Sequence, residues 1–428
     1  MTTFLGPILT LHEQAAQRNT WLRRRLETLL PELMARAGLD MWIVVAREYN
    51  EDPVLLTLIP EPEMAARRRT ILVFARRADG SVERLVVGRY GYSGVGPQDA
   101  GLYTSVWDPD AEPQDACLRR VVAERDPARI GVNVSPTFAF GDGLSHHEHE
   151  RLVAALGPEL SVRMVSAEAL AVGWLERRLP EELAAYDEIV AMAHRLIDRA
   201  FSREVITPGH TTVDEVVWWL RQAIHDHGLR AWFHPAVEIQ ARGLPREAAP
   251  NQSAPRRTTI EPGDLLWVDV GFTYLGLCTD HQRNAYVLRE GEREAPVGLR
   301  AALAAGNRLQ DILLEEMRPG RTGNEVLRSA RERALAEGLR PSIYAHPLGL
   351  HGHGAGPTIG LWDRQDGVPG SGDYPLYDHT VYAIELNVRH DVPEWGGQEV
   401  RIALEEDAAL AGGAMRWLAG RQESLILI

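Results

Sequence analysis

The chain has 428 residues, of which 45% are hydrophobic and 25% are charged, and its formal net charge is −14. This length exceeds what one hydrophobic core ordinarily organises, so two domains are expected. The acidic balance argues against nucleic acid or an anionic membrane as a partner, because binding either of them requires a basic surface.

The two cysteines, Cys117 and Cys278, form no CxxC pattern, which argues against a disulfide framework and against a thiolate zinc site. Residues 1–14 lack a basic segment followed by a sustained apolar run, so no signal peptide is expected. No apolar run reaches the roughly eighteen residues that a membrane-spanning helix requires. We therefore expect a soluble, cytoplasmic protein.

The first part of the chain alternates helix and strand patterns. Residues 12–37 are charged and helix-forming, and a second helix is expected over residues 146–156. Four apolar runs predict strands, at residues 41–46, 71–75, 84–90 and 129–134. The turn sequence ADGS at residues 78–81 predicts a hairpin between the second and third of them. These segments predict an N-terminal α/β domain over residues 1–171.

Three histidines, His146, His147 and His149, lie in the second of these helices. They would bind a metal ion only if their side chains converged, and positions i, i+1 and i+3 do not share one helical face. We therefore interpret the trio as part of a solvated surface.

A long helix is expected after the first domain. Pro180 stands near its start, and Glu181 and Glu182 lie in its first turn, where the helix dipole favours acidic side chains. We place the domain boundary just before this helix, so the second domain covers residues 172–428.

An internal repeat organises the second domain. The segments that begin at Ile206 and Met317 share a succession of Pro-Gly, Thr, Glu-Val, a helical stretch, Gly-Leu-Arg, a short strand and His-Pro. Chance easily produces a Pro-Gly match, but agreement of the whole succession is hard to ascribe to chance. The repeat predicts two similar α/β halves that pack together and form a site between them.

Two aspartates lie between the repeats, in predicted strands joined by a turn. Asp269 lies inside LLWVDVG, whose apolar composition indicates a strand buried on both faces. Asp280 lies at or near the start of the next strand, where it would stand beside Asp269. A lone aspartate is more often a turn or capping residue. Two neighbouring buried carboxylates repel each other, however, and a divalent cation is the simplest way to keep both ionised.

Two glutamates late in the chain extend this acidic set. Glu385 is the only acid in the predicted strand TVYAIELNV, and Glu405 shares one face of a predicted strand with Glu399 and Arg401. Glu406 would point the other way, to the outer face or behind the site. Four carboxylates from separate strands form a hard-ligand cage for two divalent ions such as Mn²⁺, Co²⁺ or Zn²⁺. A water that bridges two such ions becomes a nucleophilic hydroxide near neutral pH.

The glycine-rich segment YAHPLGLHGHGAG adds His346, His351 and His353. Glycines let the backbone approach a ligand closely. Three histidines in so short a segment exceed what a satisfied core histidine would explain, so we predict that the segment belongs to the functional site.

These motifs resemble the creatinase/aminopeptidase "pita-bread" metallopeptidase family, which includes methionine aminopeptidase, aminopeptidase P and prolidase. The resemblance rests on the eleven-residue spacing from Asp269 to Asp280 with Arg283 after it, on the glycine-flanked histidines, and on the sequences AIELN at Glu385 and LEED at Glu405. It covers nearly the whole chain, because the N-terminal α/β domain resembles that of prolidases, aminopeptidases P and creatinase. The implied fold class is α/β (α+β), with a pseudo-symmetric pita-bread catalytic domain.

The resemblance also implies a function. It implies five metal ligands, which are Asp269, Asp280, one histidine, Glu385 and Glu405. It implies exopeptidase cleavage of short peptides, most often at an Xaa-Pro bond, with Glu385 as the proton shuttle for the attacking water. Mn²⁺ is the expected metal and a homodimer the expected assembly. We assign His351 and Arg283 to substrate binding.

Two alignments compete for the histidine ligand. In the first, His346 is the ligand and His353 helps to stabilise the tetrahedral intermediate. In the second, His353 in GHGAG is the ligand, and Gly360 stands where the helper should be. We favour the first alignment, because it preserves the family's spacing of ligand, glycine and helper.

Three features depart from the family pattern at the substrate end. Gln252 and Ser253 stand where the family has a histidine before its first aspartate. His234 is then the candidate for that catalytic role, across an insertion at residues 241–257 whose arginines are candidates for binding the substrate's carboxylate. The connection at residues 362–375 is also longer than in the family.

A non-peptidase on the same scaffold is the competing hypothesis, either a creatinase-like amidinohydrolase or a peptide-binding pseudoenzyme. Retention of all four carboxylates argues against both, because an abandoned site would be free to lose such unfavourable buried charge.

Overall fold

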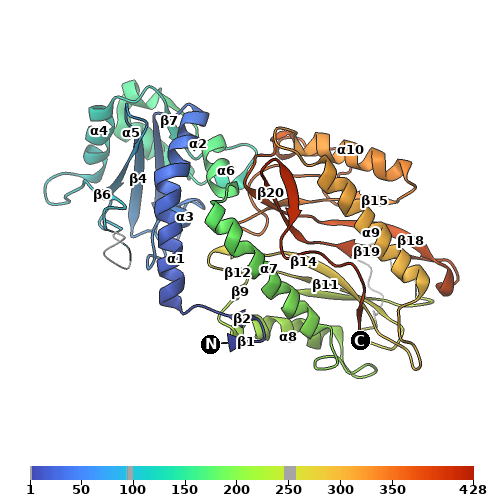
Figure 1. Ribbon diagram of the computed structural model, residues 1–428. Coiled ribbons are helices and arrows are strands. Elements are labelled where there is room, and N and C mark those ends of the chain that lie inside the picture. The colour runs from blue at the N-terminus through green and yellow to red at the C-terminus, as the bar shows by residue number, and fades with distance from the viewer. Residues whose placement is uncertain (1, 93, 95–99, 245–256) are drawn as a thin grey trace. The chain divides into compact units, whose positions relative to one another are not determined.

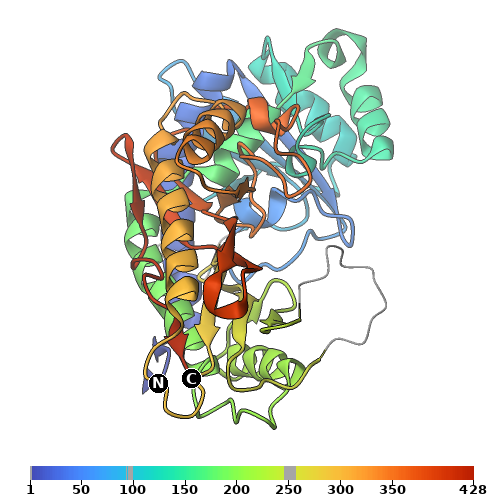
Figure 2. The same ribbon diagram turned by 90° about the vertical axis from the view of Figure 1, so that its right-hand side faces the viewer.

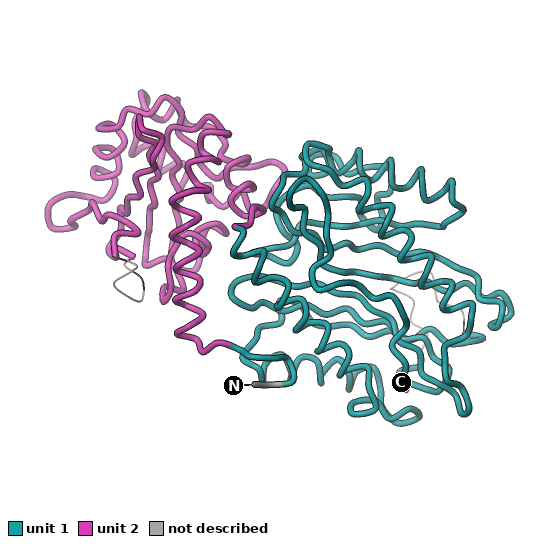
Figure 3. The backbone as a smooth tube through the Cα atoms, viewed as in Figure 1, with its two compact units in different colours: residues 1–8, 180–428 teal, residues 9–179 magenta. Residues whose placement is uncertain are grey.

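The computed structural model describes residues 2–92, 94, 100–244 and 257–428. The chain forms two compact units, coloured separately in Figure 3. The N-terminal unit is residues 9–179, and the C-terminal unit is residues 180–428 with the first eight residues of the chain. The boundary expected before residue 172 falls inside helix α6 (Glu168–Glu176), whose buried side chains pack against α2 (Leu30–Ala37) within the N-terminal unit.

The N-terminal unit is built on a six-stranded sheet in the order β6-β5-β4-β3-β7-β8. Its strands are β3 (Met41–Arg47), β4 (Arg69–Arg76), β5 (Val82–Val87), β6 (Thr104–Ser105), β7 (Ile130–Val132) and β8 (Met164–Ser166). Its helices are α1 (Leu11–Arg24), a π turn (Arg25–Leu29), α2, α3 (Leu55–Leu58), α4 (Gln114–Arg125), a 3₁₀ turn (Ala139–Gly141), α5 (His146–Ser161) and α6.

The four strands predicted for this unit are confirmed as β3, β4, β5 and β7. β4 and β5 are antiparallel, and the predicted turn between them contains Gly80 with φ +84°. Apolar side chains on one face of β3, β4 and β5 share a core with α4 and α5. The side chains on the other face of β3 and β4 are buried as well, which explains why these two strands read as continuous apolar runs. His146 and His147 are exposed and His149 is half-buried, so the trio lies at the surface as expected.

The C-terminal unit has two halves of similar order (Figure 1). The first contains α7 (Pro180–Ala200), α8 (Val213–Asp226), β9 (Arg230–Ala231), β10 (Ala236–Gln240), β11 (Leu265–Val270), β12 (Phe272–Tyr274), β13 (Leu277–Cys278) and β14 (His281–Tyr286). The second contains α9 (Val297–Glu316), α10 (Gly323–Ala336), β15 (Pro341–Ile343), β16 (His346–Leu348), β17 (Thr380–Ala383), β18 (Leu386–Val392), β19 (Gln398–Leu404) and β20 (Asp407–Ala411). The remaining elements are β1 (Thr2–Thr3), β2 (Gly6–Pro7), β21 (Ala414–Trp417), β22 (Ile426–Leu427) and 3₁₀ turns at Ser371–Asp373 and Pro393–Trp395.

Helices cover the sheets of this unit. The two larger sheets have the orders β10-β11-β14-β22 and β16-β17-β20-β21, and β15-β18-β19 forms a third. Helix α9 packs along β18 and β19, as the two views in Figures 1 and 2 show. Its apolar side chains Leu299 and Leu303 belong to one core with Val388 of β18 and Ile402 of β19. Burial of this amphipathic face holds the helix against the sheet.

The predicted repeat is confirmed in α8 and α10, which each have fourteen residues. Both begin with a capping box, in which the side chains of Thr212 and Thr322 accept from the backbone N–H of Glu215 and Glu325. The first copy, from Pro208 to Gly228, is one residue longer than the second, from Pro319 to Gly338. The extra residue lies before Thr212, because the capping threonine must stand three residues ahead of its glutamate.

Removing one of these caps tests their contribution to the fold. We expect Thr322→Ala to lower the free energy of unfolding of the C-terminal unit by about 1 kcal/mol, because the backbone N–H of Glu325 loses its acceptor. Urea unfolding followed by circular dichroism measures the change. Glu332→Ala, at an exposed position of the same helix, is the control and should change stability by less than about 0.5 kcal/mol. Equal effects of the two substitutions would contradict the capping role.

Candidate metal centre

The antiparallel strands β11 and β14 position the two aspartates. Asp269 in β11 lies opposite Gln282 in β14, and Asp280 immediately precedes β14. Gly271 directly follows β11, at a position with no space for a side chain, since a Cβ there would lie 2.3 Å from the carbonyl oxygen of Thr279. The predicted adjacency of the two strands is therefore confirmed, and the glycine lets the backbone at Thr279, just before Asp280, pass close to the end of β11.

The two glutamates stand where the chain passes from one sheet to another. Glu385 lies between β17 and β18, and Glu405 lies between β19 and β20. The prediction of a continuous strand around each acid is wrong, because β17 pairs with β20 in one sheet and β18 pairs with β19 in another. Two backbone hydrogen bonds hold the chain in place where it changes sheet at Glu405. The N–H groups of Gln282 and Glu405 each donate to the other residue's carbonyl oxygen at 3.0 Å.

His346, at the start of β16, points among these acids. Its Nε2 lies 3.3 Å from Oε1 of Glu405, 3.6 Å from Oδ2 of Asp280 and 3.9 Å from Oε2 of Glu385. Oxygen atoms of Asp269, Asp280 and Glu405 also lie within 4.8 Å of one another. The first half of the unit thus contributes two acids, and the second half contributes two acids and the histidine.

Several of these polar atoms are buried without a hydrogen bond to the described residues. They are Oδ1 of Asp269, Oδ1 of Asp280, Nε2 of His346 and Oε1 of Glu405. Leaving such an atom without a partner costs about 1–3 kcal/mol, and more when the group is charged. Four of them around one point therefore call for a common partner.

Mutual repulsion and burial perturb all four acids in the absence of a cation. Burial raises the pKa of Asp269 to about 7, although the charges of His346 and Arg401 oppose the shift. Burial and the neighbouring carboxylates raise the pKa values of Asp280, Glu385 and Glu405 well above their ordinary range. A set of carboxyl groups that all resist ionisation together is what a cation site shows without its cations.

The donor set fits divalent metal ions. Carboxylate oxygens suit hard ions such as Mn²⁺, and one imidazole is also compatible with Zn²⁺ and Co²⁺. A cation at the meeting point of these atoms would supply the partner that the four unbonded atoms lack. It would also hold the four carboxylates ionised at neutral pH.

Gln282 is a site residue that the sequence did not reveal. Its Nε2 donates to Oε1 of Glu385 and, at 2.8 Å, to Oε2 of Glu405. The indole N–H of Trp267 donates to Oε1 of Gln282 at 3.0 Å, and because an indole N–H can only donate, it fixes which end of the amide faces the acids. The only sequence signal for this role is the position of Gln282 two residues after Asp280, on the same face of the strand.

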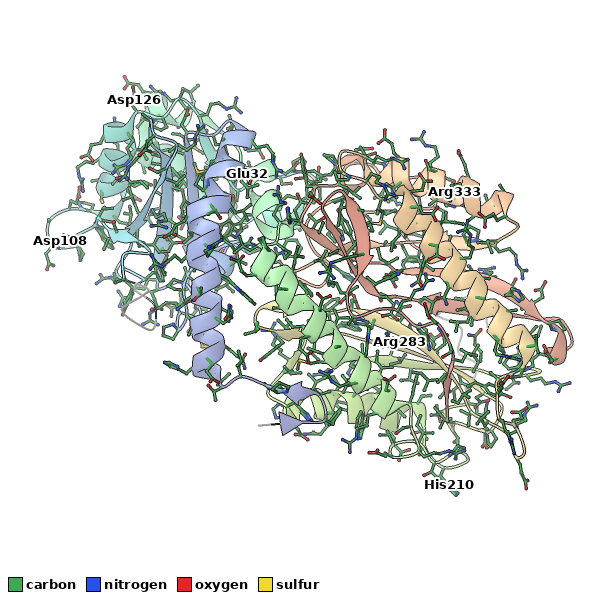
Figure 4. The ribbon with its side chains drawn as sticks, in the orientation of Figure 1. Glu32, Asp108, Asp126, His210, Arg283 and Arg333 are labelled. Carbon is green, nitrogen blue, oxygen red and sulfur yellow. The ribbon has the colours of Figure 1, made fainter. Side chains whose placement is uncertain are left out.

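Glu406 lies behind the site and is fully buried, so the outer-face alternative of its sequence interpretation is wrong. Arg283, labelled in Figure 4, is 7% exposed and donates through Nε at 2.8 Å and Nη2 at 3.1 Å to the two oxygens of Glu406. Despite burial, Arg283 and His194 lower the pKa of Glu406 to about 2. This pairing favours a structural role for Arg283 over the substrate contact predicted for it.

The other predicted histidines lie at different distances from the acids. His353 belongs with Asp280 and His346 to a group whose ligand atoms lie within 4.8 Å of one another, and its ring centroid is 4.8 Å from that of His346. His351 is half-buried in the same loop, where its carbonyl accepts from the N–H of Gly349. His353 also stands edge-on to Trp232, with the ring centroids 5.2 Å apart.

His234 does not join this group. It is exposed, its Nδ1 lies 3.0 Å from Nη1 of Arg221, and its ring packs edge-on to Trp218. The predicted role of the 241–257 insertion falls largely on residues 245–256, with Gln252 and Ser253 among them, which lie outside the described residues. The long connection at 362–375 contains the 3₁₀ turn Ser371–Asp373 and is held to α10 by Asn324, whose Nδ2 donates to Oδ1 of Asp373.

The raised pKa of Asp269 predicts a pH dependence for protein stripped of metal. Folded Asp269 holds its proton up to about pH 7, whereas the unfolded side chain releases it near about pH 4. The folded state therefore binds more protons between these values, and stability falls as pH rises through this window. The loss should be on the order of a few kcal/mol, since each pKa unit is worth about 1.4 kcal/mol. Thermal unfolding in excess chelator at several pH values measures it.

Two variants control this experiment. Asp269→Asn should make the pH dependence less steep, because the amide does not titrate and only Asp280, Glu385 and Glu405 still contribute, whereas Asp363→Asn, at an exposed aspartate, should leave it as in the parent protein. Stability that stays level or rises across the same window in chelator would contradict the assignment of Asp269 as a buried acid that resists ionisation.

Solved structures with a similar fold include the X-Pro aminopeptidase from Thermotoga maritima, with a TM-score of 0.64, 18% identity and coverage of 92% of this chain and 99% of that one. The Xaa-Pro dipeptidase from Bacillus anthracis has a TM-score of 0.61 and 18% identity over 97% and 100% of the two chains. Dipeptidase PepE from Mycobacterium ulcerans has a TM-score of 0.60 and 19% identity over 96% and 98%. These likenesses show the pita-bread fold with its N-terminal domain, as the sequence predicted.

The search of curated proteins gave no match. Among the described residues, no helix combines the length and apolar character needed to cross a membrane. The model of metallopeptidase family M24 matches residues 184–409, which is more than half of the chain and includes the four acids and His346. The chain therefore belongs to metallopeptidase family M24.

Proposed function

We propose that this protein is a dinuclear metal-dependent exopeptidase that cleaves short peptides, preferentially at Xaa-Pro bonds. The observation that carries the proposal is the convergence of four buried or half-buried acids with His346, four of whose combined polar atoms are buried without a hydrogen bond to the described residues. The Xaa-Pro names of the Thermotoga maritima and Bacillus anthracis proteins support the substrate class.

Five residues would hold the two ions: Asp269, Asp280, His346, Glu385 and Glu405. Bound divalent ions lower the pKa of a water ligand to near neutrality and polarise the peptide carbonyl. Mn²⁺ suits this carboxylate-rich set best, with Co²⁺ and Zn²⁺ as alternatives. The homodimer and the cytoplasmic location stay predictions from the sequence.

Glu385 is the best-placed acid for moving the proton of the attacking water. Its side chain is 16% exposed, whereas that of Glu405 is 2% exposed, so Glu385 is the glutamate more accessible to substrate and solvent. Nearby cations would oppose the effect of burial and keep Glu385 ionised, as a proton acceptor must be. The hydrogen bond from Gln282 would hold its other oxygen in place while the proton moves.

His353 is the proposed donor to the oxygen of the tetrahedral intermediate. Part of its side chain is exposed, but its ring stands against Trp232 and His346. The resulting desolvation, aided by His346, lowers the pKa of His353 to about 4. The ring is then neutral at pH 7 and offers one N–H to the developing negative charge.

Metal-dependent hydrolysis is the direct test. We expect release of proline from Ala-Pro, or of alanine from Ala-Pro-Ala, in the presence of Mn²⁺ and none after chelation, with the preferred peptide separating dipeptidase from aminopeptidase activity. Glu385→Gln should lower kcat by about 10²-fold or more, because the proton acceptor is lost. Glu399→Gln, an exposed glutamate of β19, is the matched control and should retain activity. Metal-independent rates, or no cleavage of any peptide in the panel, would reject the proposal.

The two competing histidine assignments give different outcomes. If His346 is the ligand, His346→Ala should reduce the metal content measured by mass spectrometry. His353→Ala should leave the metal content intact and lower kcat by about 10²-fold, as loss of one oxyanion donor does. Loss of metal from His353→Ala with retention in His346→Ala would instead support the alignment that makes His353 the ligand.

A further inference from the structure

A second cluster of metal-type side chains lies behind the five proposed ligands. It comprises His194 of α7, His281 at the start of β14, Glu406, and Asp407 at the start of β20. Nε2 of His194 lies 3.0 Å from Oε2 of Glu406, and Nε2 of His281 lies 3.7 Å from the same oxygen. Nε2 of His281 is also 3.9 Å from Oδ2 of Asp407. We call these four residues the histidine–carboxylate cluster.

Strand geometry separates this cluster from the first one. His281 and Glu406 directly follow Asp280 and Glu405 in the chain, and successive side chains in extended backbone point to opposite sides. The ligand atoms of His194, His281 and Glu406 form a compact group of their own, which shares no member with the groups that contain the five proposed ligands.

Two members of this cluster have unbonded polar atoms in the interior. Both ring nitrogens of His281 are buried and make no hydrogen bond to the described residues, and the same is true of Oδ1 of Asp407. The side chains of both residues are 0% exposed. A neutral imidazole needs a donor for one nitrogen and an acceptor for the other, so this burial is costly unless a further partner is present.

The net charge of the cluster favours a bound cation. Arg283 neutralises Glu406, whose Oε1 also accepts from the N–H of Gln422 at 2.8 Å. Among the described residues no arginine pairs with Asp407, whose Oδ2 accepts a long hydrogen bond of 3.4 Å from the N–H of Asp280. Two carboxylates and one guanidinium give a net negative charge that a divalent ion would offset.

We propose that the histidine–carboxylate cluster binds a Zn²⁺ ion through His194, His281 and Glu406. Two imidazoles with one carboxylate are a ligand set that zinc accepts. Zinc–ligand bonds of about 2.0–2.1 Å place tetrahedral ligand atoms about 3.3 Å apart. The separations of 3.0 Å from His194 to Glu406 and 3.7 Å from His281 to Glu406 bracket that spacing, and the ligand atoms of all three residues lie within 4.8 Å of one another. Asp407 lies outside this group and contributes negative charge beside it.

The side chains of His281 and Glu406 are 0% exposed and that of His194 is 13% exposed, so the ion would be shielded from substrate, and we assign it a structural role. The ion ties α7 to β14 and to the link between β19 and β20, next to Asp280 and Glu405 in the chain. It therefore fixes the backbone that presents two of the proposed catalytic ligands, and it takes no part in the reaction itself.

Zinc content and anomalous diffraction test this site. The full-length protein is loaded with Zn²⁺, dialysed, and analysed by mass spectrometry together with His194→Leu and the control His225→Leu, an exposed histidine of α8. We expect His194→Leu to lose about one zinc per chain and the control to lose none. The double variant Asp269→Asn/Glu385→Gln should keep the ion that depends on His194, so failure of the proposed peptidase site and failure of this site give different results.

A crystal of the parent protein measured at the zinc edge gives an outcome that does not depend on how the variants fold. An anomalous peak bonded to Nε2 of His194 and Nε2 of His281 supports the site. A water molecule there without anomalous signal, or unchanged zinc content in His194→Leu, overturns it.

Discussion

Four carboxylates confined to one largely buried space are the constraint on which the rest of the C-terminal unit depends. Each acid alone pays for burial, and each raises the cost for its neighbours, so the apo site prefers to be protonated. The fold keeps them together because Asp269 lies in a paired strand and the other three acids lie directly beside the ends of paired strands. Bound cations would relieve this repulsion, which is consistent with membership of a metallopeptidase family.

Hydrogen bonds from residues outside the proposed ligand set orient the acidic side chains. Trp267 orients the amide of Gln282, and Gln282 holds one oxygen of Glu385 and one of Glu405. Arg283 keeps Glu406 ionised on the other side of the same backbone. Outer contacts of this kind commonly orient metal ligands and tune their affinity. Strand pairing places the histidine. Among His346, His351 and His353, only His346 belongs to a paired strand, and its ring points among the acids.

The sequence predicted the four acids because a buried carboxylate in an apolar run is unusual enough to need an explanation. It predicted the repeat because turns and caps require particular residues, as Thr212 and Thr322 illustrate. It did not reveal the breaks at Glu385 and Glu405, since an apolar pattern continues across a change of sheet. Gln282 and the histidine–carboxylate cluster were missed for a related reason: they arise from tertiary contacts between segments with no common pattern in the chain.

The division of ligands between the two halves has a mechanical consequence. The first half supplies only aspartates, and the second supplies the glutamates and the imidazole. Ions coordinated by ligands from both halves would link the two halves without a covalent bond. The halves would then separate only as fast as the ions dissociate, and resistance to heat or to proteases would depend on the concentration of metal in the surroundings.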